Sequence, residues 1–204
     1  SHYESFGPHS AQEPWGYSPY SRPERFPRIP NDISTMDDYK RWIDGYDCGV
    51  KYVDDHIGHV LDALERQGVL DDTAIIISAD HGENLGELNV YGDHQTADYV
   101  TGRVPLIVRW PGKDQGTVVD GMCYNVDLSA TVTELCDQAC LSVWDGESFA
   151  HALDGQPWNG RDTVVVSQGA WACQRGVRFG PWMMIRTWHD GLKNFPPVML
   201  FNIE

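Results

Sequence analysis

Residues 73–84, TAIIISADHGEN, indicate the fold class of this chain. The apolar run from Ile75 to Ile77 is short and β-branched, which predicts a strand buried on both faces of a parallel α/β sheet. Asp80, His81 and Gly82 follow it, and glycine lets the backbone turn sharply. Because ligands of open α/β sheets bind just beyond the carboxyl ends of strands, Asp80 and His81 are predicted to lie at a metal or anion site. The alternative is a strand that ends in a polar turn.

Two further blocks accompany this stretch. One is YGDH at 91–94, which leads into RVPLIVRWPG at 103–112, and the other runs from GY at 45–46 to YVDDHIG at 52–58. Together with IIISADHGENLGE at 75–87, they resemble the sulfatases of the alkaline-phosphatase superfamily in order and spacing, over roughly residues 35–204. The resemblance implies an α/β fold. It would be a partial alkaline-phosphatase-like α/β/α sandwich with a small C-terminal antiparallel sheet.

The charge of the chain limits its partners. The formal net charge is -15 and the isoelectric point is near 4.7. Nucleic acids and anionic membranes need basic patches, so neither is an expected partner. An enzyme of anionic esters remains compatible with this charge, provided that a bound cation and local basic groups reverse the potential at its site.

The cysteines indicate a reducing compartment. There are five, at 48, 123, 136, 140 and 173, and they form neither a CxxC pair nor a zinc ligand set. An odd and sparse count is typical of free thiols, which favours the cytoplasm. Cys136 and Cys140, four residues apart on a predicted helix, are expected to be buried on one face. The sequence shows no signal peptide and no membrane-length apolar run, although a signal peptide could precede Ser1 in a longer protein.

Three segments are expected along the chain. Residues 1–33 are rich in Pro, Ser and Tyr, which excludes a long helix and predicts an extended arm across a partner surface, with disorder as the alternative. Residues 34–140 are expected to form the part of the α/β core that carries the metal-site strand. Residues 141–204 are expected to form the C-terminal antiparallel subdomain.

Periodicity predicts the elements. A long helix should begin at a cap on Ser34 or Thr35 and stop at Gly68, with one buried face made by apolar residues from Tyr39 to Leu64. A second helix is expected at 127–136. Short strands are expected at 73–79, 104–108, 163–167, 176–179, 182–186 and 198–202, with a hairpin turn at Gly180-Pro181.

The resemblance also implies roles for three side chains. Asp80 would be a direct metal ligand, and His81 fills the position where relatives carry Asn or His. Calcium is the expected ion because it prefers oxygen ligands, and the imidazole makes manganese or zinc a weaker alternative. His94 lies where the family places a basic residue that contacts the sulfate and the leaving-group oxygen, so it is the predicted catalytic residue. A structural role in its loop is the alternative.

The nucleophile is expected elsewhere. Sulfatases use a formylglycine made within a Cys/Ser-x-Pro/Ala-x-Arg motif near the N-terminus, and the expectation is that no cysteine and no serine of this chain stands in one. The chain is therefore predicted to be the C-terminal portion of a sulfatase lacking the formylglycine motif. A missing N-terminal part would supply that residue and a second metal-ligating Asp pair. The parent would hydrolyse a sulfated small molecule or sugar, and this chain alone would be inactive. The alternatives are a phosphodiesterase or phosphonate monoester hydrolase, or a non-catalytic binding module.

Overall fold

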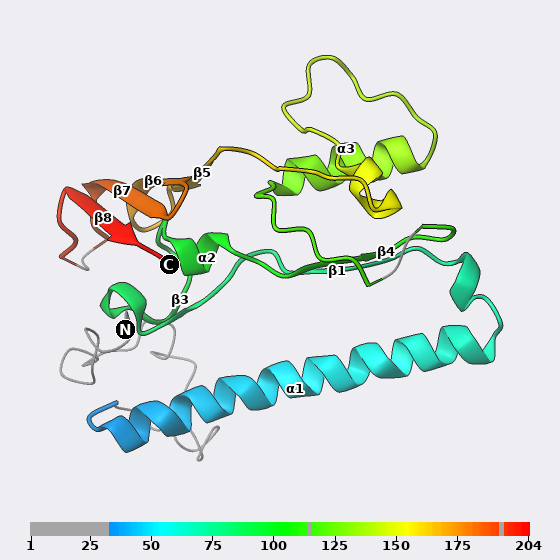
Figure 1. Ribbon diagram of the computed structural model, residues 1–204. Coiled ribbons are helices and arrows are strands. Elements are labelled where there is room, and N and C mark those ends of the chain that lie inside the picture. Colours follow the sequence, from blue (N-terminus) through cyan, green and yellow to red (C-terminus); the bar gives the residue numbers. More distant parts are fainter. Residues whose placement is uncertain (1–32, 114–115, 192–193) are drawn as a thin grey trace.

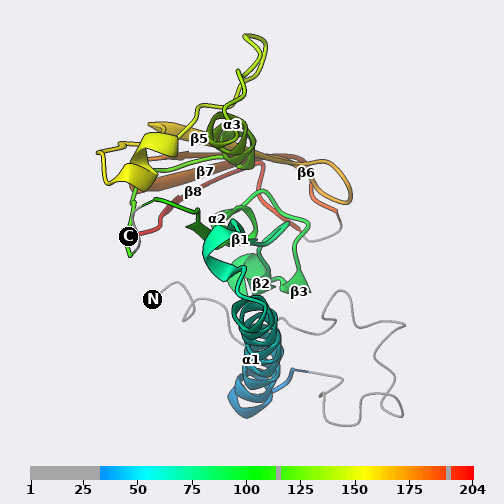
Figure 2. The same ribbon diagram turned by 90° about the vertical axis from the view of Figure 1, so that its right-hand side faces the viewer.

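The computed structural model describes residues 33–113, 116–191 and 194–204, so the predicted arm lies outside the described residues almost entirely. Figure 1 shows three layers over the middle of the chain: helix α1 (Met36–Arg66), a ribbon of strands β1 (Ile75–Ser78) and β4 (Leu106–Arg109), and helix α3 (Asn125–Leu135) on the opposite side. The view in Figure 2 shows the same order of layers. This is the helix–sheet–helix arrangement expected from the sequence.

Helix α1 begins where its sequence predicts. Thr35 is the N-cap, and its side chain and that of Asp38 each bond the other's backbone N–H in a capping box. The helix ends at Arg66, just before Gly68, whose φ of 68° suits glycine. Its 31 residues correspond to a length of about 46 Å at about 1.5 Å per residue.

The predicted buried face of α1 is covered near its N-terminal end and in part near its C-terminal end, where Ile57, Leu61 and Leu64 are half-buried. Tyr39, Trp42 and Ile43 pack against Tyr91 and Leu85, and Trp42 is only 6% exposed. Between these ends the side chains on the same stripe are mostly exposed, namely Tyr46, Val50, Val53 and Val60. The prediction of one continuous buried face is therefore wrong for the middle of the helix within the described chain. The reason is that the sheet beside α1 has only two strands among the described residues.

Strand β1 also differs from its prediction. It pairs antiparallel with β4, from Ile75 opposite Arg109 to Ser78 opposite Leu106, and its side chains alternate between half-buried and exposed. The prediction of a strand buried on both faces of a parallel sheet is wrong for the described residues, among which β4 is its only partner strand. Because the pairing is antiparallel, the loop between the strands leaves and returns at the carboxyl end of β1.

That loop carries short elements of its own. It contains β2 (Asn84–Leu85), the 3₁₀ turn η4 (Glu87–Asn89), β3 (Tyr91–Asp93) and α2 (Tyr99–Gly102), with β2 and β3 paired antiparallel. A second 3₁₀ turn, η3 (Leu70–Asp72), joins α1 to β1, and η5 (Ala150–Asp154) follows α3. Among the described helices none is long and apolar enough to cross a lipid bilayer.

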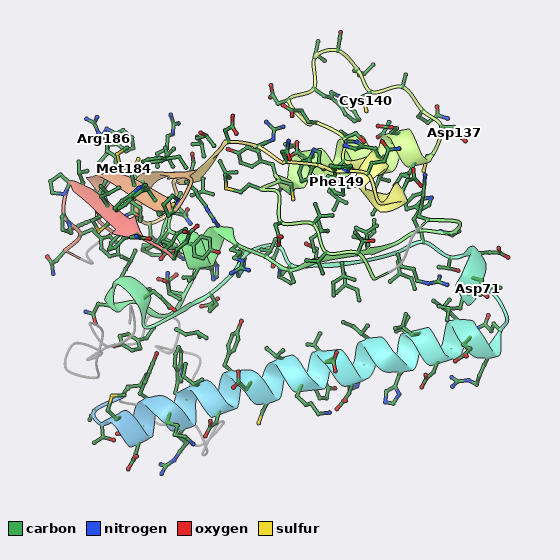
Figure 3. The ribbon with its side chains drawn as sticks, in the orientation of Figure 1. Asp71, Asp137, Cys140, Phe149, Met184 and Arg186 are labelled. Atoms are coloured by element: carbon green, nitrogen blue, oxygen red, sulfur yellow. The ribbon has the colours of Figure 1, made fainter. Side chains whose placement is uncertain are left out.

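The C-terminal antiparallel sheet forms as predicted. Its strands lie in sequence order: β5 (Thr163–Gln168), β6 (Cys173–Phe179), β7 (Trp182–His189) and β8 (Val198–Asn202). Phe179 pairs with Trp182 across the turn at Gly180-Pro181. The inner face of the sheet, with Met183 and Ile185, packs on Leu88 and Val90. Met184 and Arg186 stand on the outer face, which points away from α2 (Figure 3).

Helix α3 is one residue shorter than predicted at its end, and this affects the cysteines. It stops at Leu135, so Cys136 caps it and Cys140 lies in the following loop. Both thiols are exposed rather than buried on a shared helical face, and that prediction is wrong. All five cysteines are free thiols in the structure.

Candidate functional site

Asp80 and His81 lie at the carboxyl end of β1, where the loop begins. The Asp80 side chain is 89% exposed, and its carboxylate accepts a hydrogen bond from the backbone N–H of His81 at 3.1 Å. The second carboxylate oxygen of Asp80 lies 3.7 Å from Nε2 of His81. This separation is short enough for both atoms to contact one ion, since ligand atoms lie about 2.0–2.6 Å from such metals.

Gly82 holds the start of the loop against α2. Its N–H donates to the carbonyl of Thr101 at 2.9 Å, and a Cβ at this position would stand 1.8 Å from the carbonyl oxygen of Val100. Its φ is not in the left-handed region. The glycine is therefore needed because two backbones approach closely, not because the chain turns sharply as the sequence suggested. The position of His81 beside α2 follows from this contact.

His81 and His94 come together although they are 13 residues apart in the sequence. Their rings stack with centroids 3.6 Å apart and planes inclined by 18°. Nδ1 of His81 lies 2.8 Å from the carbonyl of Gly82, which leaves Nε2 facing outward toward Asp80. His94 directly follows β3, so the β2–β3 pairing brings it back to the end of β1.

Glu83 completes this group, and the sequence did not single it out. One of its carboxylate oxygens lies 3.2 Å from Nδ1 of His94, and its side chain is 20% exposed. Burial raises the pKa of the Glu83 carboxyl above its ordinary value, an effect that His94 and His81 partly offset. A signal was present, because side chains two residues apart in an extended chain project to the same side, as those of His81 and Glu83 do.

We call His81, Glu83 and His94 the His–Glu–His cluster. One ligand atom from each side chain can be chosen so that all three lie within 4.8 Å of one another. Asp80 is outside the cluster, although it adjoins His81. The structure thus brings all three predicted site residues to one end of β1 and adds Glu83 to them.

The C-terminal sheet positions the loop that bears His94. The side-chain amide of Gln168 donates to the His94 carbonyl at 3.3 Å, and the amide oxygen of Gln174 accepts from the Ala97 N–H at 3.0 Å. Gly176 allows a close approach, since a Cβ there would stand 2.1 Å from the Ala97 carbonyl oxygen. The sheet is therefore part of the support of the site.

One sequence feature corrects the expected absence of a nucleophile motif. Although no cysteine fits Cys/Ser-x-Pro/Ala-x-Arg, the serine form does occur once, as Ser21-Arg22-Pro23-Glu24-Arg25. The expectation that the motif is missing is therefore wrong for serine. This segment lies outside the described residues.

Known proteins resemble this chain over most of its length. A family model described as Sulfatase matches residues 3–138, which includes most of the segment predicted to be an arm. Choline-sulfatase of Rhizobium meliloti is 27% identical over 176 residues, covering 83% of this chain and 32% of that protein. N-acetylglucosamine-6-O-sulfatase of Bacteroides thetaiotaomicron is 30% identical over 119 residues, covering 58% of this chain and 21% of that protein.

The fold is shared with solved structures as well. Phosphonate monoester hydrolase of Silicibacter pomeroyi superposes with a TM-score of 0.69 and 26% identity, covering 87% of this chain and 37% of the other. The alkaline-phosphatase-like α/β fold predicted from the sequence is thereby confirmed. The chain spans about a third or less of the length of the curated relatives described above.

Proposed function

The chain belongs to the sulfatase family, and we propose that it is the part of a sulfate-ester hydrolase that holds half of a metal site and a sulfate-contacting histidine. The observation that carries this proposal is the meeting of His81 and His94 beside Asp80 at the carboxyl end of β1, in a chain of this family. Sulfate-ester hydrolysis is the activity of the family. The activity of the whole protein is proposed from that membership.

Sulfate-ester hydrolysis needs a proton donor, and His94 is proposed to be that donor. Hydrolysis breaks the bond between sulfur and the ester oxygen, and the departing alkoxide needs a proton while negative charge on the sulfuryl oxygens needs donors. Nδ1 of His94 faces Glu83, so the ring is held in one orientation and Nε2 remains for the ester. Neither Lys nor Arg occurs between Gly82 and Gly102, so no other side chain of this loop offers a cationic donor.

The expected calcium ion fits the site in part. The Asp80 carboxylate is an oxygen donor of the kind that calcium prefers, and His81 stands within reach of the same ion. Calcium takes about 6–8 ligands, mostly oxygens, so the remaining donors would come from sequence beyond these residues. Such an ion would neutralise the charge of the sulfuryl oxygens. We propose Asp80 and His81 as its ligands from this chain.

The nucleophile is proposed to be a formylglycine supplied by another part of the same protein. The small share of the relatives that the chain covers supports this proposal. Ser21 is the one residue of the chain in the required sequence context. Purified chain should therefore be assayed with an aryl sulfate and calcium, alongside Ser21→Ala. No turnover is expected from either, and activity that Ser21→Ala abolishes would place the nucleophile inside the chain.

The role of His94 is tested in the complete protein that contains this chain. His94→Ala should lower kcat by about 10²- to 10⁴-fold, the usual contribution of general acid–base catalysis. His59→Ala, an exposed histidine on α1, is the matched control and should leave kcat unchanged. A kcat that His94→Ala leaves within a few-fold of the parent value contradicts the proposal and supports a structural role.

A phosphonate or phosphodiester hydrolase is the second candidate. The structural likeness to phosphonate monoester hydrolase favours it. The choline- and sugar-sulfatase relatives favour a sulfated small molecule or sugar instead. Sulfate and phosphonate esters with the same aryl leaving group separate the two, because kcat/KM should be higher for the sulfate. The reverse preference would assign the second function, and no turnover of either by the complete protein would favour a binding module.

A further inference from the structure

The donor set of the His–Glu–His cluster differs from that of the proposed calcium site. Two of its three donors are imidazoles and one is a carboxylate, whereas calcium binds oxygen ligands almost alone. Imidazole with carboxylate suits zinc and neighbouring transition metals, and zinc sites with three protein ligands leave one position open. The cluster therefore has the composition of a zinc site, one that shares His81 with the Asp80–His81 pair.

We propose that the His–Glu–His cluster binds a zinc-class transition-metal ion through His81, Glu83 and His94, without Asp80. Tetrahedral ligands about 2.0–2.1 Å from zinc stand about 3.4 Å apart. The Glu83 oxygen and His94 Nδ1 are already 3.2 Å apart, and one ligand atom from each of the three side chains can be chosen so that all lie within 4.8 Å of one another. The distances need only a small contraction, but the orientation of one ring has to change.

The stacking of the His81 and His94 rings requires one of them to turn before both can bind the same ion. A nitrogen lone pair lies in the plane of its ring, so two parallel rings cannot both aim at one ion, and one of them has to turn. The two side chains are equally exposed, at 40% for His81 and 42% for His94, so exposure does not decide which ring turns. His94 contacts Glu83 through Nδ1 and accepts from Gln168 through its carbonyl, so His81 is the ring that we expect to turn. The contact of His81 Nδ1 with the Gly82 carbonyl would keep Nε2 as the ligand atom.

Binding there would change the activity as well. A zinc ion on Nδ1 of His94 would fix the orientation of the ring whose Nε2 is proposed to contact the ester, and it would also take His81, a proposed calcium ligand. Zinc should therefore inhibit the enzyme. This consequence rests on the proposed function of His94, while the binding itself does not. The cluster would thus be an inhibitory metal site superimposed on the catalytic one.

Binding is tested with zinc alone on the 204-residue chain, by competition with a chromophoric chelator at neutral pH. One ion per chain is expected, and excess calcium should not displace it. Glu83→Gln and His94→Ala should each weaken binding at least about 10- to 100-fold, the loss seen even for groups that only support a ligand. Asp80→Asn, the matched neighbouring carboxylate, should leave the affinity within about threefold, and circular dichroism confirms that each variant is folded.

The outcomes separate the two sites. If Asp80→Asn weakens zinc binding as much as Glu83→Gln does, the ion sits on the Asp80–His81 pair and the proposal is overturned. If none of these variants changes the affinity, zinc binds elsewhere and the proposal fails too. Zinc that binds as proposed but does not inhibit the complete protein would contradict the role of His94 instead. If zinc does inhibit, Glu83→Gln should weaken the inhibition in proportion to its loss of zinc affinity.

Discussion

The C-terminal sheet and helix α1 both carry an apolar face, but only the sheet has that face covered over most of its length. The sheet buries Met183 and Ile185 against Leu88 and Val90 of the loop between β1 and β4. The middle of α1 has no such partner among the described residues, and Val53 is 56% exposed there. Apolar side chains stabilise a fold only where something excludes water from them. Burial of apolar side chains therefore stabilises the sheet region, whereas the apolar side chains in the middle of α1 contribute little among the described residues.

Ion pairs show a similar contrast, here between the start of α3 and the α1–β1 region. Asp127 at the start of α3 is fully buried and accepts two hydrogen bonds from Arg161, one of them at 2.5 Å from Nη2. The backbone N–H groups of Tyr124 and Glu147 donate to the same carboxylate. Arg109, which ties β4 to η3, instead pairs with Asp71, whose side chain is 98% exposed. A buried pair is costly to break, while an exposed one is worth little.

The largest effect is therefore expected from Arg161→Ala. It leaves the Asp127 charge buried without its partner, which should lower the free energy of unfolding by about 3–5 kcal/mol. Chemical denaturation followed by tryptophan fluorescence measures this. Asp71→Asn is the matched control in the α1–β1 region and should leave the unfolding midpoint unchanged. Equal losses from the two variants would contradict the contrast between the regions.

Ile185→Ala should have the next largest effect. The side chain is 0% exposed on the inner face of β7, so truncation removes apolar contacts and leaves a cavity. The free energy of unfolding should fall by about 2–5 kcal/mol in the same denaturation experiment. A loss below about 1 kcal/mol would show that the sheet core is looser than its burial implies, because even Ile→Val substitutions cost about 0.5–1.5 kcal/mol in packed cores.

Asp98→Asn should have a smaller and pH-dependent effect of the opposite sign. Asp98 is 5% exposed, and one of its carboxylate oxygens has no hydrogen-bond partner among the described residues. Burial raises the pKa of this carboxyl above 3.8, although hydrogen bonds from Thr101 partly counter it. Its contribution is thus greatest in acid and lost as pH rises through the raised pKa.

Asn at position 98 carries no charge at any pH, so the variant does not lose stability as pH rises. It also keeps the side-chain oxygen that caps α2 at Thr101. Asp98→Asn should therefore be more stable than the parent at neutral pH, and the difference should vanish in acid. Unfolding midpoints across the acid-to-neutral range check the sign. Asp127 behaves oppositely: burial would raise its pKa, but Arg161 and two backbone N–H groups hold it below the usual value. Its contribution is lost as pH falls through that lowered pKa.

Val53→Ala should have the smallest effect. This side chain lies on the uncovered stripe of α1, and alanine is the better helix former, so the free energy of unfolding should change by less than about 0.5 kcal/mol. The measurement is the same denaturation curve in the 204-residue chain. A loss as large as that of Ile185→Ala would mean that the stripe is covered in solution, and size-exclusion chromatography would then show whether a second copy covers it.

Much of the fold was predictable because local chemistry specifies it. The capping box at Thr35, the stop at Gly68 and the hairpin turn at Gly180-Pro181 depend on neighbouring residues, and each lies where the sequence places it. The β5–β8 strands were likewise predicted from short runs of residues with turns between them. The pairing of β1 and the burial of α1 were mispredicted, because both depend on which distant strands are present.

For the candidate site, the sequence alone predicted which residues would lie at the end of β1: a carboxylate, an imidazole and a second imidazole 13 residues further on, in blocks that resemble a sulfatase. The stacking of the two imidazoles, and the 3.2 Å approach of Glu83 to one of them, became known only from the folded chain. Residue types carry chemistry locally, whereas distances across a loop depend on backbone contacts such as that of Gly82 with Thr101, which no local pattern encodes.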